Sequence, residues 1–148
     1  MIERMKPSEP TARPRVIVLG AGQNPSIAEG AERLRSTVEK QCDIVVWDLA
    51  FERDLAEIEA DYVLVFGGDG SILRAAHQMG YRQRPMLGVN LGKLGFLADV
   101  TPSELPALLP KLCRDELPID RHVMLQVTLV RNGHELWTEL ALNEAAVL

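Results

Sequence analysis

Short apolar segments alternate with longer amphipathic ones over most of the chain. Four of the apolar segments are rich in β-branched and aliphatic side chains, namely residues 15–20, 43–47, 61–66 and 85–90. Such continuous runs are typical of strands that are buried on both faces of a sheet. Helical patterns lie between them, at residues 25–40, at residues 51–60 and from Ser71 onward. The alternation predicts an α/β fold, with a Rossmann-like parallel sheet and flanking helices.

The hydrophobic pattern changes in the last part of the chain. Thr101 followed by Pro102 is typical of a helix start and predicts a helix that ends near Cys113. Beyond that helix, residues 124–131 and 134–142 alternate between apolar and polar side chains, and an Asn-Gly pair separates them. This pattern predicts two antiparallel strands joined by a tight hairpin turn.

These patterns divide the chain into three parts. Residues 1–14 carry prolines and charges without periodicity, so we interpret them as a disordered leader. Residues 15–120 form the predicted α/β nucleotide-binding domain, and residues 121–148 the first strands of a β-rich domain. Because a lone hairpin is marginally stable and the last residues are apolar, we expect the chain to be truncated, with the rest of that domain after Leu148.

Composition narrows the class of protein. The chain has 148 residues, of which 47% are hydrophobic and 25% charged, as in an ordinary soluble domain with a core. The net charge of -5 and the lack of any basic run argue against nucleic-acid binding. No apolar stretch approaches the roughly 20 residues of a membrane helix, and the first residues lack a signal peptide's apolar segment. We therefore expect a cytoplasmic protein without membrane or nucleic-acid partners.

Cysteine usage adds a further exclusion. Cys42 and Cys113 are the two cysteines of the chain, and no Cys-x-x-Cys or His spacing suits a metal cage. A disulfide framework or a structural zinc site is therefore not expected. We predict that both residues are reduced and mostly buried thiols.

The strongest candidate chemistry follows the third predicted strand, in the segment Gly67-Gly68-Asp69-Gly70-Ser71. Glycines let backbone N–H groups approach an anion closely, and the next helix would aim its positive N-terminal end at the same place. A carboxylate beside bound phosphates is repelled unless it holds a cation or takes a proton from an attacking hydroxyl. Asp69 is therefore a candidate metal-binding group or general base for phosphoryl transfer. The alternative is a tight turn with a solvated aspartate.

A second glycine-rich turn follows the fourth predicted strand, between Gly88 and Asp99. Since the carboxyl ends of parallel strands lie at one edge of a sheet, both turns are expected at the same ligand site. Asn90 could hydrogen-bond a ribose or a base edge, and Phe96 could stack on adenine or belong to the core. Lys93 could approach phosphates or be a solvated turn residue.

Three other polar features carry weaker hypotheses. The turn after the first strand has the first two glycines of the dinucleotide fingerprint, but Pro25 stands where the third belongs. Because this pattern is broken, Asp48 is interpreted as a polar strand end rather than a ribose-binding acid, and a dehydrogenase is disfavoured. His77 could face phosphates, but a helix-surface or packed imidazole is the preferred interpretation.

Three segments in this order and spacing resemble those of bacterial NAD kinases, which phosphorylate NAD to NADP. They are residues 67–76, residues 88–97 and the segment 141–144 with its Asn-Glu pair. The resemblance covers residues 16–148 and implies an α/β N-terminal domain followed by a β-rich NAD-binding domain. Ser71 stands where the family more often has threonine, and the family's later glycine-rich and Thr/Ser-Ala-Tyr segments are absent from this chain.

The resemblance also implies roles for single residues. Asp69 matches the proposed general base, Asn143 and Glu144 match a pair that contacts the dinucleotide, and Phe96 matches a phenylalanine next to the NAD site. No side chain is predicted as a metal ligand. The phosphate-binding set is Gly67, Gly68, Gly70 and Ser71. The NAD-binding set is Asp69, Gly70, Asn90, Phe96, Asn143 and Glu144.

The expected reaction follows from these roles. Asp69 would take the proton of the adenosine ribose 2′-hydroxyl of NAD as this oxygen attacks the γ-phosphate of ATP. Backbone amides of Gly68 and Gly70 and a divalent cation, Mg²⁺, would relieve charge on the transferred group. The resemblance implies a homodimer or homotetramer, and activity of this chain by itself is expected to be impaired.

Two other functions stay open at this point. Lipid kinases of the diacylglycerol type and phosphofructokinases share the Gly-Gly-Asp-Gly loop, although neither pairs it with the turn that contains Asn90 and Phe96. The first alternative is therefore one of these kinases, and the second is a non-catalytic fragment that binds nucleotide without turnover.

Overall fold

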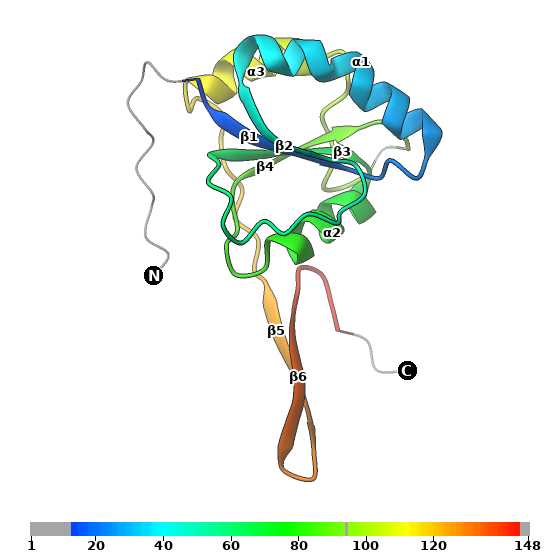
Figure 1. Ribbon diagram of the computed structural model, residues 1–148, viewed down its shortest axis with the longest axis vertical. Coiled ribbons are helices and arrows are strands. Elements are labelled where there is room, and N and C mark those ends of the chain that lie inside the picture. Colours follow the sequence, from blue (N-terminus) through cyan, green and yellow to red (C-terminus); the bar gives the residue numbers. More distant parts are fainter. Residues whose placement is uncertain (1–12, 94, 146–148) are drawn as a thin grey trace.

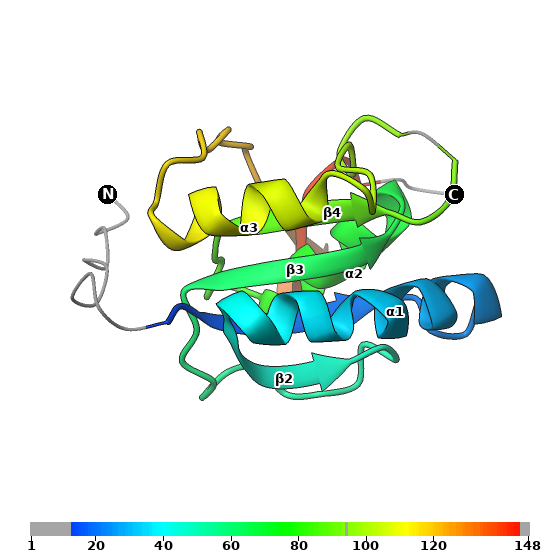
Figure 2. The same ribbon diagram turned by 90° about the horizontal axis from the view of Figure 1, so that it is seen from above.

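The computed structural model describes residues 13–93 and 95–145, and its main part is a four-stranded parallel sheet (Figure 1). The strands are β1 (Arg15–Gly20), β2 (Asp43–Asp48), β3 (Tyr62–Gly67) and β4 (Met86–Asn90), in the order β2-β1-β3-β4. The helices are α1 (Pro25–Gln41), α2 (Asp69–Met79) and α3 (Leu105–Cys113). Helices α1 and α3 lie together over one face of the sheet, and α2 lies over the other (Figure 2). The predicted α/β fold is confirmed.

Burial explains why the strands are continuous apolar runs. In β1, Val16 and Val18 pack into the core beneath α1 and α3, whereas Ile17 and Leu19 pack into the core on the α2 side. None of the four is exposed. Because both faces of the sheet are covered, successive side chains of an inner strand all enter apolar surroundings.

The last two strands form a separate antiparallel hairpin, β5 (Leu125–Arg131) and β6 (His134–Ala141). Asn132 and Gly133 have φ angles of 53° and 78°, and two positive φ angles in succession are what the predicted tight turn requires. The hairpin projects away from the α/β part below α2 (Figure 1). Several of its large apolar side chains are exposed, namely Leu125, Leu129, Val130, Leu136 and Trp137.

The predicted helix over residues 51–60 is wrong, because this segment is a loop. Its backbone is instead bound by the side chain at the end of β2. The carboxylate of Asp48 accepts hydrogen bonds of 2.8–2.9 Å from the backbone N–H groups of Ala50, Glu52 and Arg53. A side chain that binds nearby amides competes with the helical hydrogen-bond pattern, and here it prevails.

The bounds of the last helix differ from the prediction at one end. Helix α3 ends at Cys113 as predicted but begins at Leu105, after a turn that starts at Thr101. In that turn the Glu104 carboxylate accepts hydrogen bonds from the backbone N–H and the hydroxyl of Thr101, at 2.8 and 2.6 Å. The Thr-Pro-Ser-Glu pattern thus marks the turn that precedes the helix.

The two cysteines confirm the prediction of reduced thiols. Cys42 is buried and Cys113 half-buried, and their sulfur atoms lie 4.0 Å apart without a disulfide. Burial, with the neighbouring Cys113, raises the pKa of the Cys42 thiol to about 12. The predicted leader falls almost wholly on residues 1–12, which lie outside the described residues. Within the described part of the chain, no helix has the length and apolar character needed to cross a bilayer.

Replacing Asp48 by alanine is expected to lower the free energy of unfolding by about 2–3 kcal/mol at neutral pH. Asp48 is only 6% exposed, and its carboxylate also accepts a 3.0 Å hydrogen bond from the Gln78 side chain. Urea unfolding measures the loss. The matched control is Asp54→Ala, which removes an exposed carboxylate with one backbone hydrogen bond and should cost less than about 1 kcal/mol.

The same contacts set the pH dependence of this stabilisation. Burial by itself would raise the pKa of the Asp48 carboxyl, but its four hydrogen bonds hold that pKa below the usual 3.8. The stabilisation is therefore complete above pH 3.8 and is lost as the pH falls through the folded-state pKa. An equal difference between wild type and Asp48→Ala at neutral and strongly acidic pH would contradict this account.

Candidate active site

The strand order reverses between β1 and β3. The chain winds from β1 outward to β2 on one side and from β3 outward to β4 on the other. Open α/β sheets bind ligands outside the carboxyl ends of their strands at such a reversal. Here those ends are Gly20 and Gly67, and the Ala21 N–H donates a 3.3 Å hydrogen bond to the Phe66 carbonyl. The glycine turn after β1 and the glycine loop after β3 therefore lie side by side.

Gly67 shapes the predicted phosphate loop. Its φ angle is 147°, and a Cβ atom built on it would lie 2.1 Å from the Ser71 hydroxyl oxygen. Helix α2 then begins at Asp69, so its positive N-terminal end faces the loop. A Cβ built on Gly68 or Gly70 would meet no atom within 4 Å, so the backbone there faces open space. An anion can approach these two residues, as the sequence predicted.

Asp69 is bound to the second glycine turn. Its Oδ2 atom accepts a 2.9 Å hydrogen bond from the Phe96 N–H, and its Oδ1 atom accepts bonds of 2.8 and 3.1 Å from the Leu97 and Ala98 N–H groups. These three donors hold the pKa of the Asp69 carboxyl below its usual value. Backbone N–H groups, and not solvent alone, thus hold the Asp69 carboxylate.

The side chain of Asn90 shapes the same turn from inside. This buried amide donates hydrogen bonds of 2.9 and 3.1 Å to the Lys93 and Ala98 carbonyls and accepts one of 2.9 Å from the Gly92 N–H. Its polar atoms thus stabilise the loop that covers Asp69. The Lys93 residue itself is exposed.

Phe96 lies at the tip of this turn with its side chain in solvent. It is 98% exposed, so the alternative that it belongs to the core is excluded. Because its backbone N–H binds Asp69, the ring is attached directly beside the carboxylate. An exposed aromatic face at this position can stack on a planar ligand.

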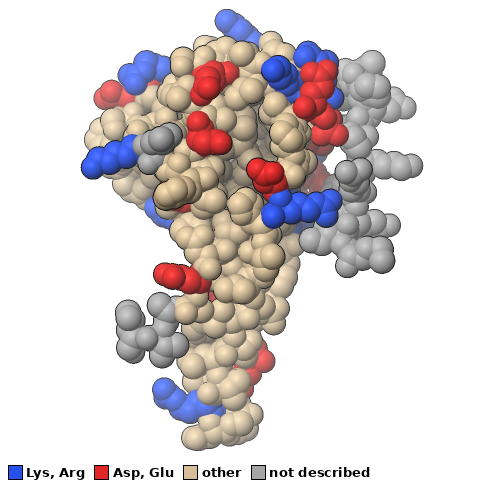
Figure 3. Space-filling model, turned by 180° about the vertical axis from the view of Figure 1, so that it is seen from behind, with Lys and Arg blue, Asp and Glu red and all other residues tan. Residues whose placement is uncertain are grey.

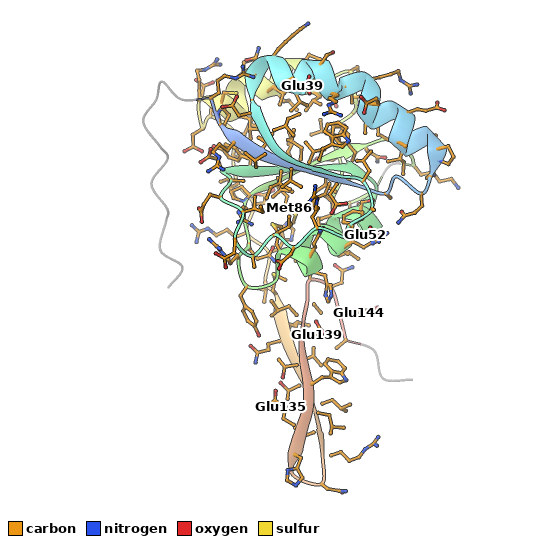
Figure 4. The ribbon with its side chains drawn as sticks, in the orientation of Figure 1. Glu39, Glu52, Met86, Glu135, Glu139 and Glu144 are labelled. Atoms are coloured by element: carbon orange, nitrogen blue, oxygen red, sulfur yellow. The ribbon has the colours of Figure 1, made fainter. Side chains whose placement is uncertain are left out.

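Asn143 and Glu144 lie opposite the face of α2 that carries Leu73 and His77. With Leu140, Ala141 and Leu142 they line a pocket of about 240 Å³, whose opposite wall is Leu73 and His77. Leu73 follows Asp69 by one helical turn, so the two residues lie on the same face of α2. Figure 4 shows Glu144 and Glu139 where the hairpin meets α2, and Glu135 nearer the hairpin tip.

His77 is exposed on the surface of α2, one of the two positions that the sequence favoured, and it lines this pocket. Its Nδ1 atom lies 3.8 Å from a carboxylate oxygen of Glu139 on β6. The sequence missed this pocket because its two walls are about 65 residues apart in the chain. The available signal was the spacing of Asp69, Leu73 and His77, which places all three on one face of the helix.

The first glycine turn and Asp48 have structural partners. The Gly22 N–H donates a 2.7 Å hydrogen bond to the Leu49 carbonyl, and a Cβ built on Gly22 would lie 2.7 Å from that oxygen. Gly22 thus allows close packing of two loops. Together with the use of Asp48 in the 49–53 loop, this confirms that Asp48 is a polar strand end.

Metal-ligating side chains do not gather at one place in the described part of the chain. Within residues 13–93 and 95–145, no group of three or more His, Cys, Asp or Glu side chains is placed to hold a metal ion. On the face shown in Figure 3, charges of both signs are scattered over the α/β part, and most of the hairpin surface is uncharged.

The fold and the site together define the class of protein. It is a doubly wound α/β domain with a glycine-rich loop and one carboxylate at its topological switch point. The sequence model of a family described as "ATP-NAD kinase N-terminal domain" matches residues 12–117. The chain belongs to the NAD kinase family.

Individual relatives agree with this membership. The chain is 43% identical to an NAD kinase of Rhodopirellula baltica over 135 residues, which cover 91% of this chain and 43% of that protein. It is 41% identical to an NAD kinase of Geobacter sulfurreducens over 88 residues, or 60% of this chain and 31% of that protein. The chain spans less than half the length of these curated relatives.

A solved structure supports the fold. The crystal structure of yeast NADH kinase complexed with NADH superimposes with a TM-score of 0.74 at 16% sequence identity. The match covers 88% of this chain and 47% of the yeast chain.

Proposed function

We propose that this protein is an NAD kinase, which transfers the γ-phosphate of ATP to the 2′-hydroxyl of the adenosine ribose of NAD to give NADP. Family membership supports the proposal. The single observation that carries it is the position of Asp69, between two glycine turns and at the N-terminus of α2, where the sheet order reverses. Phosphoryl transfer needs a base and anion-binding amides side by side, and this arrangement supplies both.

The roles of the site residues are proposed from their positions. Asp69 acts as the general base, while the open backbone of Gly68 and Gly70 binds phosphates. Gly67 and Ser71 set the shape of that loop by their close packing.

The acceptor dinucleotide is proposed to lie along α2. Asn143 and Glu144 would contact it from the pocket that begins one turn beyond Asp69. Phe96 offers its exposed ring, and Asn90 contributes by holding the turn that carries Phe96 and the amides bound to Asp69. Gly70, with no side chain, leaves room beside the base.

Mg²⁺ fits this site as an ion that is bound mainly by the nucleotide. This cation keeps several waters and commonly uses one or two carboxylates together with substrate phosphates. The open loop at Gly68 and Gly70 suits a nucleotide that carries the ion with it, because three N–H donors already bind the Asp69 carboxylate. When bound, the ion would neutralise charge on the transferred phosphoryl group.

We also propose that residues 15–120 and 121–148 belong to two domains, the second of them β-rich and NAD-binding. The exposed apolar side chains of the hairpin, such as Leu129 and Trp137, support a role as part of a larger buried surface. The family resemblance supports a homodimer or homotetramer. Since relatives are more than twice as long, residues 1–148 alone are expected to be impaired in catalysis.

The proposed function is tested with the full-length protein and three acceptors. NAD, a diacylglycerol and a sugar phosphate are each supplied with ATP and Mg²⁺, and NADP formation is measured beside the other phosphorylated products. NADP as the one product is the expected result. Phosphorylation of the lipid or the sugar phosphate would contradict the proposal. Calorimetric binding of NAD and ATP without any turnover would instead indicate a binding protein.

A further inference from the structure

Gly95 lies against the Asp69 carboxylate more closely than any side chain would allow. A Cβ atom built on Gly95 would be 2.3 Å from Oδ1, 2.6 Å from Cγ and 2.8 Å from Oδ2 of Asp69. The φ angle of Gly95 is not in the positive range that favours glycine. Glycine is therefore required here for the close approach to one functional group.

This approach allows the backbone of the turn to bind the carboxylate. The three donors are the N–H groups of the residues that directly follow Gly95, namely Phe96, Leu97 and Ala98. A carboxylate has about four acceptor positions, two on each oxygen. Oδ1 accepts two of the bonds and Oδ2 accepts one. One acceptor position is left, and it belongs to Oδ2.

We propose that Gly95 is a positioning residue for phosphoryl transfer, which lets the 95–98 turn close on Asp69 so that Oδ2 presents the one remaining acceptor position to the substrate hydroxyl. This inference rests on the proposed function. It assigns a role to a glycine outside the predicted phosphate-binding and NAD-binding sets, and it names the oxygen atom that receives the proton.

In the proposed step, the ribose hydroxyl attacks the γ-phosphorus of ATP. The ribose O–H bond breaks, its proton goes to Oδ2 of Asp69, and its electron pair forms the new bond to the γ-phosphorus. The bond between that phosphorus and the bridging oxygen of ATP breaks, and ADP leaves with the electron pair. The three amides keep the carboxylate in one orientation while the proton moves, which is the positional requirement of general base catalysis.

Two glycines of the same turn give a matched pair of substitutions. Gly95→Ala would place a methyl group on the Asp69 carboxylate, which can yield by turning away because it is the end of a side chain. Gly92→Ala adds the same methyl group where the nearest atom, Oδ1 of Asn90, is 4.0 Å away. Neither residue has a positive φ angle, so backbone strain does not distinguish them.

Steady-state kinetics of the full-length protein with NAD and ATP tests the proposal. Gly95→Ala is expected to lower kcat by about 10²-fold, the effect of a misplaced catalytic group, with the KM for ATP within about threefold of wild type. The acidic limb of its kcat profile should move to higher pH, because loss of N–H donors raises the pKa of the Asp69 carboxyl. Gly92→Ala should match wild type in both properties.

Two results would overturn the inference. One is a Gly95→Ala protein whose kcat and pH profile equal those of wild type. The other is a raised KM for NAD with unchanged kcat and pH profile, which would mean that Gly95 serves the neighbouring Phe96 ring alone. If Asp69→Asn abolishes activity while Gly95→Ala does not change it, the base assignment stands and the role of Gly95 fails.

A measurement without turnover keeps the inference testable if the proposed activity fails. The pKa of the Asp69 carboxyl is measured by NMR with ¹³C-labelled aspartate in wild type and Gly95→Ala. We expect it below the usual range in wild type, with the Phe96, Leu97 and Ala98 amide resonances following the same titration, and higher in the variant. Unchanged values, or three amides that do not follow the carboxyl in wild type, would overturn it.

Discussion

Replacing Asp69 by asparagine is expected to lower kcat by about 10²–10⁴-fold, with the KM values for NAD and ATP within a few-fold of wild type. Asparagine is nearly the same size but cannot take a proton from the ribose hydroxyl. Its amide also has one acceptor oxygen, so it cannot hold the three N–H donors of the 96–98 backbone. Steady-state kinetics of the full-length variant with NAD and ATP measures the loss.

A second carboxylate in the same turn provides the control. Asp99 is exposed, and its replacement by asparagine removes one negative charge from the same region. Asp99→Asn should therefore keep kcat within about twofold, which separates a lost base from a changed local potential. Full activity of Asp69→Asn, or an equal loss in Asp99→Asn, would refute the assignment of Asp69.

The pH dependence of kcat gives an independent test of the assignment of Asp69 as the general base. A general base acts only when it is ionised, so kcat falls as the pH drops through the pKa of Asp69 in the substrate complex. The backbone N–H groups hold that pKa below its usual value in the protein described here. An acidic limb at or above neutral pH would therefore belong to a group other than Asp69.

The sheet could be predicted from the sequence because strands that are buried on both faces are continuous apolar runs. Residues 16–19 of β1 and 62–66 of β3 are all apolar, because helices cover both faces of the sheet. The hairpin was equally clear, because Asn132 and Gly133 are the residues that tolerate two positive φ angles. In both cases one local rule determines the element without help from distant residues.

The helix predicted over residues 51–60 is wrong because a residue outside this segment determines its structure. Its own residues allow a helix, but one carboxylate outside it, Asp48, binds its first amides. A propensity summed within a window does not include such a competitor. The interpretation of Asp48 as a polar strand end is correct, but it does not identify the amides that the carboxylate binds.

The site was predictable in its side chains and not in its backbone partners. Asp69 among glycines indicated chemistry because a lone acid beside an anion site needs a cause. Its binding groups are N–H atoms of residues 27–29 positions away, and every residue except proline has such an atom. The one residue in the sequence that indicates these hydrogen bonds is Gly95, because its lack of a side chain lets the backbone approach the Asp69 carboxylate.

Replacing Gly67 by alanine is expected to lower the free energy of unfolding by about 3 kcal/mol. The φ angle of 147° is one that residues with a side chain rarely adopt. The added Cβ would also lie 2.1 Å from the hydroxyl oxygen and 2.8 Å from the Cβ of Ser71, which is buried. Rotation of the Ser71 hydroxyl relieves the first overlap but not the second. Urea unfolding of the full-length variant measures the loss.

Gly68→Ala is the matched control in the adjacent position. Gly68 has a φ angle of -116°, which alanine adopts readily, and its Cβ would meet nothing within 4 Å, so the expected loss is below about 1 kcal/mol. Because its backbone is open, the same methyl group should weaken ATP binding without loosening the fold. Equal stability losses in the two variants would mean that the phosphate loop is mobile enough to absorb the overlap at Gly67, and the close packing against Ser71 would then have no role in shaping it.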